Sequence, residues 1–212
     1  MIRSAKKETP PELNSQPSVQ MTLQSSESSI AMALIPKKPV YFGPFLVTSQ
    51  VFFMTSLSFA LVNLKPLLPG HVLVSPIRNV PRVSDLTPDE IADLFITVRR
   101  VGRMVERVFK SSSLNIAIQD GVDAGQSVPH VHAHIIPRRR ADLDHKGGSD
   151  AIYGMLDGDE GDIAKHMWQK MEGRSRTKFP AVDNDSRMPR SDEEMREEAE
   201  MLAKEMEKEP LD

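Results

Sequence analysis

Three histidines alternate with apolar residues in the segment HVHAHII, where they occupy positions 130, 132 and 134. Side chains alternate across an extended strand, so this spacing predicts that the imidazoles of His130, His132 and His134 project from one face and the apolar side chains from the other. Histidines that merely fill a core strand are a poor explanation, because each buried ring nitrogen needs a hydrogen-bond partner. The spacing therefore predicts a chemical site.

Two kinds of chemistry fit these histidines. Histidines that alternate on a strand can supply zinc ligands, and His71 or Asp120 would then complete the metal's shell. The loop from Gly125 to Val128, which precedes the histidines, instead offers an amide, a hydroxyl and backbone N–H groups. Such donors suit phosphate oxygens, so the loop favours phosphate chemistry, with a zinc enzyme as the alternative.

Short β-rich runs separated by turn-forming residues surround this site. They predict neighbouring antiparallel strands and read VFFMT, LSFALVN, HVLVSP, LNIAIQ and HVHAHIIP. Pro69-Gly70 would turn the chain so that His71 emerges where the third run begins. The sequence thus predicts an α+β fold with an antiparallel sheet of about five strands.

The clearest helix follows the third run. Thr87 suits the N-cap, Pro88 the first helical position, and Glu90 completes a capping box. Apolar residues then recur at helical spacing from Ile91 to Phe109, which predicts one stripe buried against the sheet. Most arginines of this helix fall off the stripe and are interpreted as a solvated face: Arg99, Arg100, Arg103 and Arg107.

Composition divides the rest of the chain. Residues 1–38 are rich in Ser and Gln and are expected to form a disordered extension, followed by a catalytic domain at 39–140. Residues 141–190 are rich in Asp, Gly and Lys and are expected to form a flexible loop. Ser191 and Glu194 form a second capping-box pattern, which predicts an acidic C-terminal helix at 191–212 that docks weakly through a narrow apolar stripe.

The overall composition excludes several classes of protein. The net charge of −3 provides no cationic field for a nucleic-acid polymer or an anionic membrane, and no apolar run is long enough to span a bilayer. The 212 residues include no cysteine, which excludes disulfides and fits a cytoplasmic protein, with the nucleus as a further compartment. Arg3 and the two lysines after it leave mitochondrial targeting as an alternative, against which Glu8 and Glu12 count.

The segment HVHAHII matches the His-φ-His-φ-His-φ-φ signature of the histidine triad superfamily, where φ is an apolar residue. The segments LSFALVNLKPLLPGHVLVSP, LTPDEIADLF and QDGVDAGQSVPHVHAHIIPR also resemble its fragile histidine triad branch, the diadenosine triphosphate hydrolases. The resemblance is close over about residues 40–155 and loose over the last twenty. It implies a homodimer with a continuous sheet.

The resemblance also implies a role for each matching residue. His132 would be the nucleophile that becomes nucleotidylated, while His130, His134 and His71, as protonated neighbours, would donate to phosphate oxygens. A neutral imidazole, with an ordinary pKa of about 6.5, can offer a lone pair near pH 7. The resemblance implies that Asn63 contacts the ribose and that His134 contacts the α-phosphate. It also implies that five residues hold the polyphosphate: Gln119, Gly125, Gln126, Ser127 and Val128.

The implied reaction converts diadenosine triphosphate to AMP and ADP in two steps. No tightly bound cofactor is expected, and a magnesium or manganese ion would accompany the substrate rather than occupy a protein cage. Two alternatives keep the same histidines: a nucleoside phosphoramidase or nucleotidyl transferase of the superfamily, and a non-catalytic nucleotide sensor. Tyr153 matches a tyrosine of the branch that can be phosphorylated, and an ordinary loop tyrosine is the alternative.

Overall fold

A computed structural model of the protein describes residues 38–172 and 189–210. The predicted N-terminal extension lies outside these residues apart from Lys38, and so does the part of the predicted flexible loop at 173–188. The helices of the described residues are α1 (Pro88–Phe109), α2 (Ala151–Asp157), α3 (Ile163–Met171) and α4 (Asp192–Met206). Short 3-10 helices are η2 (Thr48–Gln50), η3 (Val83–Asp85), η4 (Val122–Ala124) and η5 (Asp144–Lys146).

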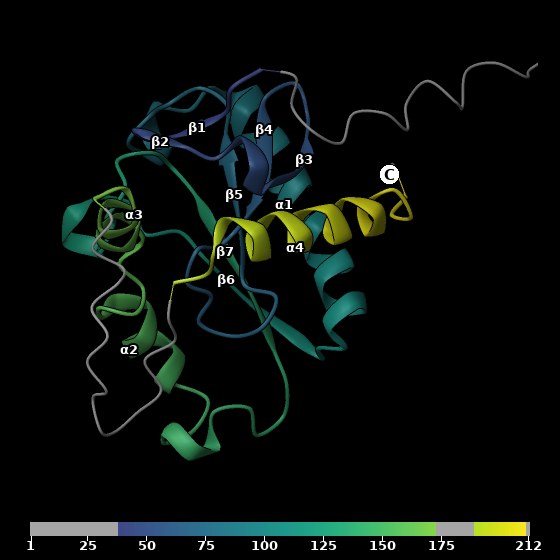
Figure 1. Cartoon of the computed structure of the whole chain (residues 1–212), viewed down its shortest axis with the longest axis vertical. Coiled ribbons are helices and arrows are strands. Elements are labelled where there is room, and N and C mark those ends of the chain that lie inside the picture. The colour runs from purple at the N-terminus through teal and green to yellow at the C-terminus, as the bar shows by residue number, and fades with distance from the viewer. Residues whose placement is uncertain (1–37, 173–188, 211–212) are drawn as a thin grey trace, which may run out of the picture. The chain divides into compact units, whose positions relative to one another are not determined.

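A five-stranded antiparallel sheet with the order β3-β4-β5-β7-β6 positions the histidines (Figure 1). Its strands are β3 (Val51–Met54), β4 (Ser58–Val62), β5 (Val72–Pro76), β6 (Ser113–Ala117) and β7 (Ala133–Arg138). Two further strands, β1 (Tyr41–Phe42) and β2 (Phe45–Leu46), form a separate small hairpin. The predicted α+β fold with an antiparallel five-stranded sheet is confirmed.

Helix α1 begins with the predicted capping box. The backbone N–H of Glu90 donates to Thr87 Oγ1 at 3.3 Å, and the backbone N–H of Thr87 donates to Glu90 Oε2 at 2.8 Å. Leu94 and later apolar residues of the stripe are buried against the sheet, but Ile91 and Phe95 are 37% and 49% exposed. The prediction of one fully buried stripe is therefore wrong at these two positions, because the sheet covers only a narrower face of the helix.

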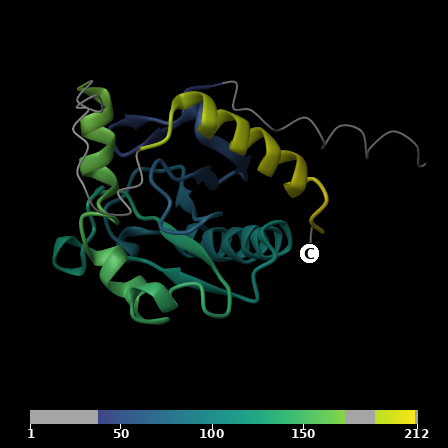
Figure 2. The same cartoon turned by 60° about the horizontal axis from the view of Figure 1, so that its bottom comes forward.

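Helix α4 packs firmly on the core, against the prediction of weak docking. Its apolar stripe is buried among residues of β3 and β4: Met195, Ala199, Leu202, Ala203 and Met206. Figures 1 and 2 both show α4 next to α1. A narrow stripe suffices here because small and flexible residues, Ala and Met, let the helix approach closely.

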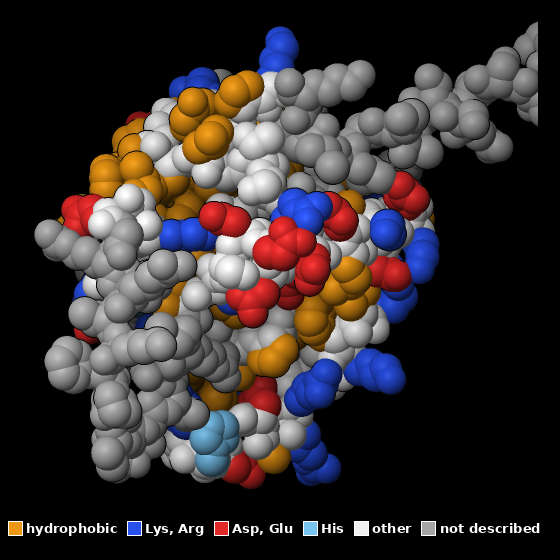
Figure 3. Space-filling model, viewed as in Figure 1, with side chains coloured by type: hydrophobic (Ala, Val, Ile, Leu, Met, Phe, Trp, Pro, Cys, Tyr) orange, Lys and Arg blue, Asp and Glu red, His pale blue; other side chains and the backbone are white. Residues whose placement is uncertain are grey.

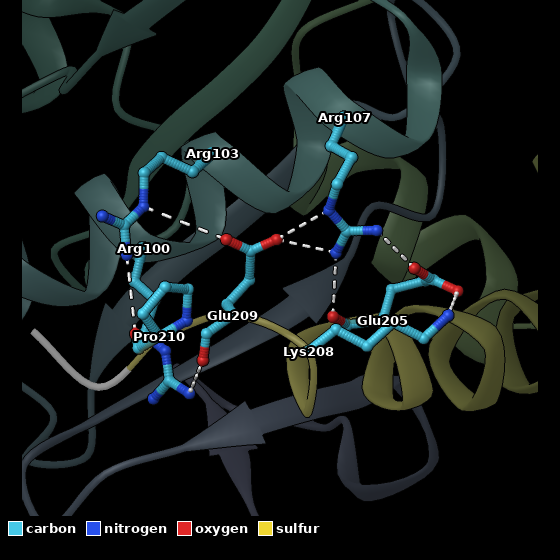
Figure 4. Close-up of polar contacts among 7 residues, drawn as sticks. All are labelled: Arg100, Arg103, Arg107, Glu205, Lys208, Glu209 and Pro210. Carbon is cyan, nitrogen blue, oxygen red and sulfur yellow. Dashed lines mark hydrogen bonds and ion pairs between the residues drawn. The ribbon is translucent and has the colours of Figure 1, made fainter.

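Three arginines of α1 bind the C-terminal segment (Figure 4), so the interpretation as a solvated face is wrong for Arg100, Arg103 and Arg107. Arg99 is exposed. Arg107 donates to Glu209 Oε1 through Nε at 2.9 Å and Nη2 at 2.7 Å, and to Glu205 Oε2 at 2.5 Å. Arg100 donates to the backbone oxygen of Glu209 at 3.0 Å. Paired charges of this kind explain how the largely buried Glu209 carboxylate is accommodated.

Residues 141–172 are more ordered than their composition predicted. Helices α2 and α3 lie in this stretch, and the buried Leu143 and Ile152 pack with Leu67, Leu68 and Ile136 in a second hydrophobic cluster. The expectation of a flexible loop is therefore wrong for 141–172. Its apolar residues are shared between two clusters, since Ile163 and Met167 of α3 join the main core while Leu143 and Ile152 join the small one. Each helix is short, so its apolar stripe is short as well.

The described surface mixes charges and apolar side chains. Figure 3 shows acidic and basic side chains next to one another over α4, and apolar side chains gathered over β1 and β2. Tyr41 and Leu46 of that hairpin are 54% and 61% exposed. Within the described ranges no helix combines the length and the apolar character that crossing a membrane requires.

Candidate active site

The histidines reach the site from two neighbouring strands. His71 lies immediately before β5, as predicted, and His134 lies in β7, where it pairs with Leu73 of β5. His130 and His132 precede β7, which begins at Ala133, so the prediction that all three histidines belong to one strand is wrong. The backbone turns before the strand begins, because the N–H of His130 bonds to the carbonyl of Val128.

His132 is held in the tautomer of a nucleophile. Its Nδ1 lies 2.7 Å from the backbone oxygen of His130. A carbonyl oxygen only accepts hydrogen bonds, so Nδ1 of the neutral ring carries the proton. The lone pair is therefore on Nε2, the nitrogen that can attack phosphorus without prior deprotonation.

A relay of hydrogen bonds sets the tautomers of His71 and His134. The backbone N–H of Leu67 donates to His71 Nδ1 at 3.2 Å, so the proton of the neutral ring is on Nε2, which lies 3.0 Å from His134 Nδ1. His134 therefore accepts at Nδ1 and carries its own proton on Nε2. In the described part of the chain no group bonds to this buried Nε2, which leaves a donor for a substrate oxygen.

Burial keeps these rings neutral. Desolvation is the main reason that the pKa of His132 falls to about 4 and that of His71 to about 3. Burial also holds the pKa of His134 well below its usual value and lowers the pKa of His130. The expectation of protonated neighbours is therefore corrected: near pH 7 these histidines donate as neutral N–H groups.

His130 supports His132 and does not face a substrate. Its Nδ1 accepts from the backbone N–H of Gly43 at 3.0 Å, and its Nε2 donates to the carbonyl of Pro76 at 2.8 Å. Both ring nitrogens are thus occupied, and the residue acts through its own carbonyl, which bonds to His132. The sequence expectation that His130 donates to phosphate is replaced by a positioning role.

Asn63 follows β4 and lies beside His71. Its Nδ2 is 3.5 Å from His71 Nδ1 and 3.4 Å from Nε2, and its Oδ1 accepts from the backbone N–H of Lys65 at 3.0 Å. The side chain is only 3% exposed. The structure thus brings Asn63 to the histidines, at the end of the strand that neighbours β5.

The loop that carries Gly125 to Val128 is braced from within. The Gln126 amide accepts from the N–H of Gly121 and donates to the carbonyl of Pro81, both at 2.9 Å, so it shapes the loop rather than facing outward. Gly125 has a φ of +85°, and a side chain there would collide with Gln119. A cavity of about 380 Å³ borders this loop, lined also by three aspartates: Asp157, Asp159 and Asp162.

Helix α3 encloses the site in this structure. The backbone N–H of Ala164 donates to Ser127 Oγ at 3.3 Å, and the Trp168 ring lies 5.1 Å from the Phe45 ring. His132 and His134 are each only 1% exposed. Helix α3 thus contacts both the loop that precedes the histidines and Phe45 of β2.

The arrangement does not resemble a metal centre. Over 38–172 and 189–210 there is no group of three or more His, Asp or Glu side chains that could hold a metal ion. Asp120, the carboxylate considered for a zinc shell, accepts from the backbone N–H of Val83 at 2.8 Å and pairs with Arg82. The donor pattern instead suits an anionic substrate.

Several supporting residues escaped the sequence analysis. Phe42 packs against His130 with ring centroids 5.6 Å apart and against His132 at 5.0 Å, while Gly43 supplies the N–H for His130. They lie almost ninety positions before the histidines, on the hairpin formed by β1 and β2. No local pattern relates such distant segments, so the sequence offered no signal for them.

Comparisons with known proteins agree with this geometry. A family model described as "HIT domain" matches residues 46–141. A bis(5'-nucleosyl)-tetraphosphatase [asymmetrical] of Schizosaccharomyces pombe is 49% identical over 172 residues, which cover 78% of this chain and 93% of the relative. A bis(5'-adenosyl)-triphosphatase of Dictyostelium discoideum is 49% identical over 136 residues, 64% of this chain and 87% of the relative.

The fold comparison points the same way. The crystal structure of the C. elegans NitFhit protein matches with a TM-score of 0.57 and 37% identity. The match covers 80% of this chain and 31% of that longer protein. Because the HIT model matches the segment that carries the histidines and the relatives are 49% identical, the chain belongs to the histidine triad (HIT) family and resembles its fragile histidine triad branch.

Proposed function

We propose that this protein hydrolyses dinucleoside polyphosphates, with diadenosine triphosphate converted to AMP and ADP through a nucleotidyl-histidine. The observation that carries the proposal is the bond from His132 Nδ1 to the His130 carbonyl, which leaves the Nε2 lone pair for attack. The names of the 49% identical relatives, a tetraphosphatase and a triphosphatase of dinucleosides, support the substrate class.

The proposed reaction follows from the tautomers. His132 Nε2 forms a bond to the α-phosphorus as the bridging P–O bond breaks and the nucleoside diphosphate leaves. The Nε2–H of His134 donates to a non-bridging oxygen, where charge develops in the transition state. Water then displaces His132, which releases the nucleoside monophosphate and restores the neutral imidazole.

The substrate contacts are proposed from position. Asn63, next to His71, would bind the ribose, while the loop from Gly125 to Val128 and the neighbouring Gln119 would bind the polyphosphate. Aspartates line the cavity beside this loop, and their charge opposes that of a polyphosphate. We therefore propose that a magnesium or manganese ion travels with the substrate and shields it.

A product assay tests the function and the length preference together. Purified protein is incubated with diadenosine triphosphate, diadenosine tetraphosphate or an adenosine phosphoramidate, with and without a chelator. Products are identified after a denaturing alkaline quench, which preserves the acid-labile P–N bonds. AMP together with ADP from the triphosphate, and a nucleotidyl adduct on His132, are the expected results. Faster cleavage of the phosphoramidate would favour the alternative activity, and no cleavage of any substrate would overturn the proposal.

We propose a homodimer through the edge strand β6, which would join two sheets into one. β6 ends the order β3-β4-β5-β7-β6, and its Ile116 is 49% exposed. Unpaired edge strands invite pairing with another chain. Ile116→Lys is expected to convert a dimer, at twice the chain mass of 23.7 kDa, to a monomer in sedimentation experiments, whereas Leu46→Lys on β2 leaves it intact. A monomeric wild-type protein would contradict the dimer.

A further inference from the structure

Arg190 connects the C-terminal helix with the strand end that carries Asn63. It lies two residues before α4, and its Nε donates to the backbone oxygen of Asn63 at 3.2 Å. Nη2 of the same guanidinium donates to that oxygen as well, and the backbone N–H of Arg190 donates to the carbonyl of Leu64 at 3.1 Å. Three hydrogen bonds from one residue thus hold the backbone of Asn63 and Leu64.

Glu198 holds the arginine in place from α4. Its Oε2 lies 2.5 Å from Arg190 Nη1, and both side chains are only 18% exposed. The Nε and Nη2 groups of Arg190 share the Asn63 oxygen while Nη1 pairs with Glu198. The guanidinium is planar, so bonds on both sides fix its orientation. The position of α4 is therefore transmitted to the backbone that follows β4.

That backbone touches the catalytic relay at two points. Asn63 Nδ2 approaches both ring nitrogens of His71, and the N–H of Leu67, four residues farther on, donates to His71 Nδ1. Among the described residues, three titratable or charged groups act on His71: His132 just before β7, His134 in β7 and Arg190 before α4. The charge of Arg190 adds to burial and His132 in lowering the pKa of His71.

We propose that Arg190 is a positioning residue for the reaction: it clamps the backbone of Asn63 and Leu64 so that His71 remains the neutral Nε2–H donor to His134. The inference rests on the proposed function for its kinetic consequences. A proton on His71 Nδ1 would face the N–H of Leu67, so protonation of His71 would break the relay. Loss of the clamp would free the backbone of Asn63 and Leu64, and it would also make His71 easier to protonate.

Arg190→Gln and Arg190→Lys separate these effects. Arg190→Gln is expected to lower kcat/KM for diadenosine triphosphate by about tenfold to hundredfold, since small displacements of catalytic groups have effects of this size. The fraction of His71 in the Nε2–H tautomer at neutral pH is expected to fall, because both the clamp and the cation facing His71 are gone. Arg190→Lys restores the charge but not the fork of donors, so a kcat that stays reduced assigns the loss to the clamp rather than to the charge.

Two further variants complete the test. Glu198→Gln retains the arginine but weakens its anchor, so a smaller loss of kcat is expected. Arg196→Gln is the matched control, since Arg196 lies exposed on α4 and pairs only with Glu193 and Glu200 among the described contacts. Thermal unfolding is measured for each variant to compare stabilities.

A measurement that does not depend on turnover distinguishes failure of the clamp from failure of the proposed function. Nitrogen NMR of histidine-labelled protein reports whether His71 is the Nε2–H tautomer, in wild type and in Arg190→Gln. If wild type cleaves no dinucleotide, the proposed function fails, while a changed His71 tautomer in Arg190→Gln still supports the clamp. The inference would be overturned by a folded Arg190→Gln that keeps the wild-type kinetics and the wild-type His71 tautomer. It would also be overturned by a kinetic loss in Arg190→Gln no larger than that in Arg196→Gln.

Discussion

Replacing His132 by asparagine is expected to lower kcat for diadenosine triphosphate by at least about 10⁴-fold, because removal of a covalent nucleophile lowers kcat by factors of this size in other enzymes. Asparagine keeps a polar group near the same position but has no ring lone pair to bond to phosphorus. Its amide NH₂ can still donate to the carbonyl of His130, which bonds to Nδ1 in the wild type. Substrate binding should therefore survive, while the amount of nucleotidylated protein recovered after a denaturing alkaline quench falls to zero.

Trp168 provides the binding measurement for this variant. It is the single tryptophan of the chain, and its ring lies 5.1 Å from that of Phe45 on the enclosing side of the site. Movement of α3 during substrate entry should change its fluorescence in wild type and in His132→Asn alike. His145→Asn, which replaces an exposed histidine outside the site, serves as the control and should retain full turnover. Undiminished cleavage by His132→Asn would exclude the nucleotidyl-histidine route.

The features that the sequence predicted well are those encoded locally. The capping box of Thr87 and Glu90 and that of Ser191 and Glu194 each involve residues three apart, and both form as expected. The turn at Gly70 and the strand that follows His71 are also local, and both were found where the pattern placed them. The histidine spacing pointed to the site because its residues are close in the chain.

The features that were missed depend on contacts between distant segments. Gly43 orients His130 from 87 positions away, and Arg190 binds Asn63 from 127 positions away. Such distant partners also decide which ring nitrogen of each histidine carries the proton. The spacing of the three histidines does not decide it. The ion pair of Arg107 on α1 with Glu209 also joins distant segments, so the local pattern of α1 could not predict it.

Acid is expected to unfold this protein through its buried histidines, before the carboxylates contribute. The four site histidines have pKa values lowered by burial, to about 4 for His132 and about 3 for His71, against about 6.5 when unfolded. Between these limits the unfolded chain binds more protons, so the stability present above pH 6.5 is lost as pH falls. Each histidine contributes a loss of about 1.4 kcal/mol per pH unit.

His132 and His71 together lose roughly 3 kcal/mol per pH unit between about pH 6.5 and pH 4, and the lowered pKa values of His130 and His134 add to this loss. Because a typical domain is stable by only about 5–15 kcal/mol, the fall should be steep before the carboxylates are protonated. Carboxylates act lower: Arg78 holds the pKa of Glu90 at about 2, so that contribution is lost only below its unfolded value of 4.5. Urea unfolding at a series of pH values, at constant protein concentration, measures the proton uptake. His132→Asn should reduce that uptake by one proton. A stability that stays constant from pH 7 to pH 5 would show that these rings are not neutral and buried in the folded protein.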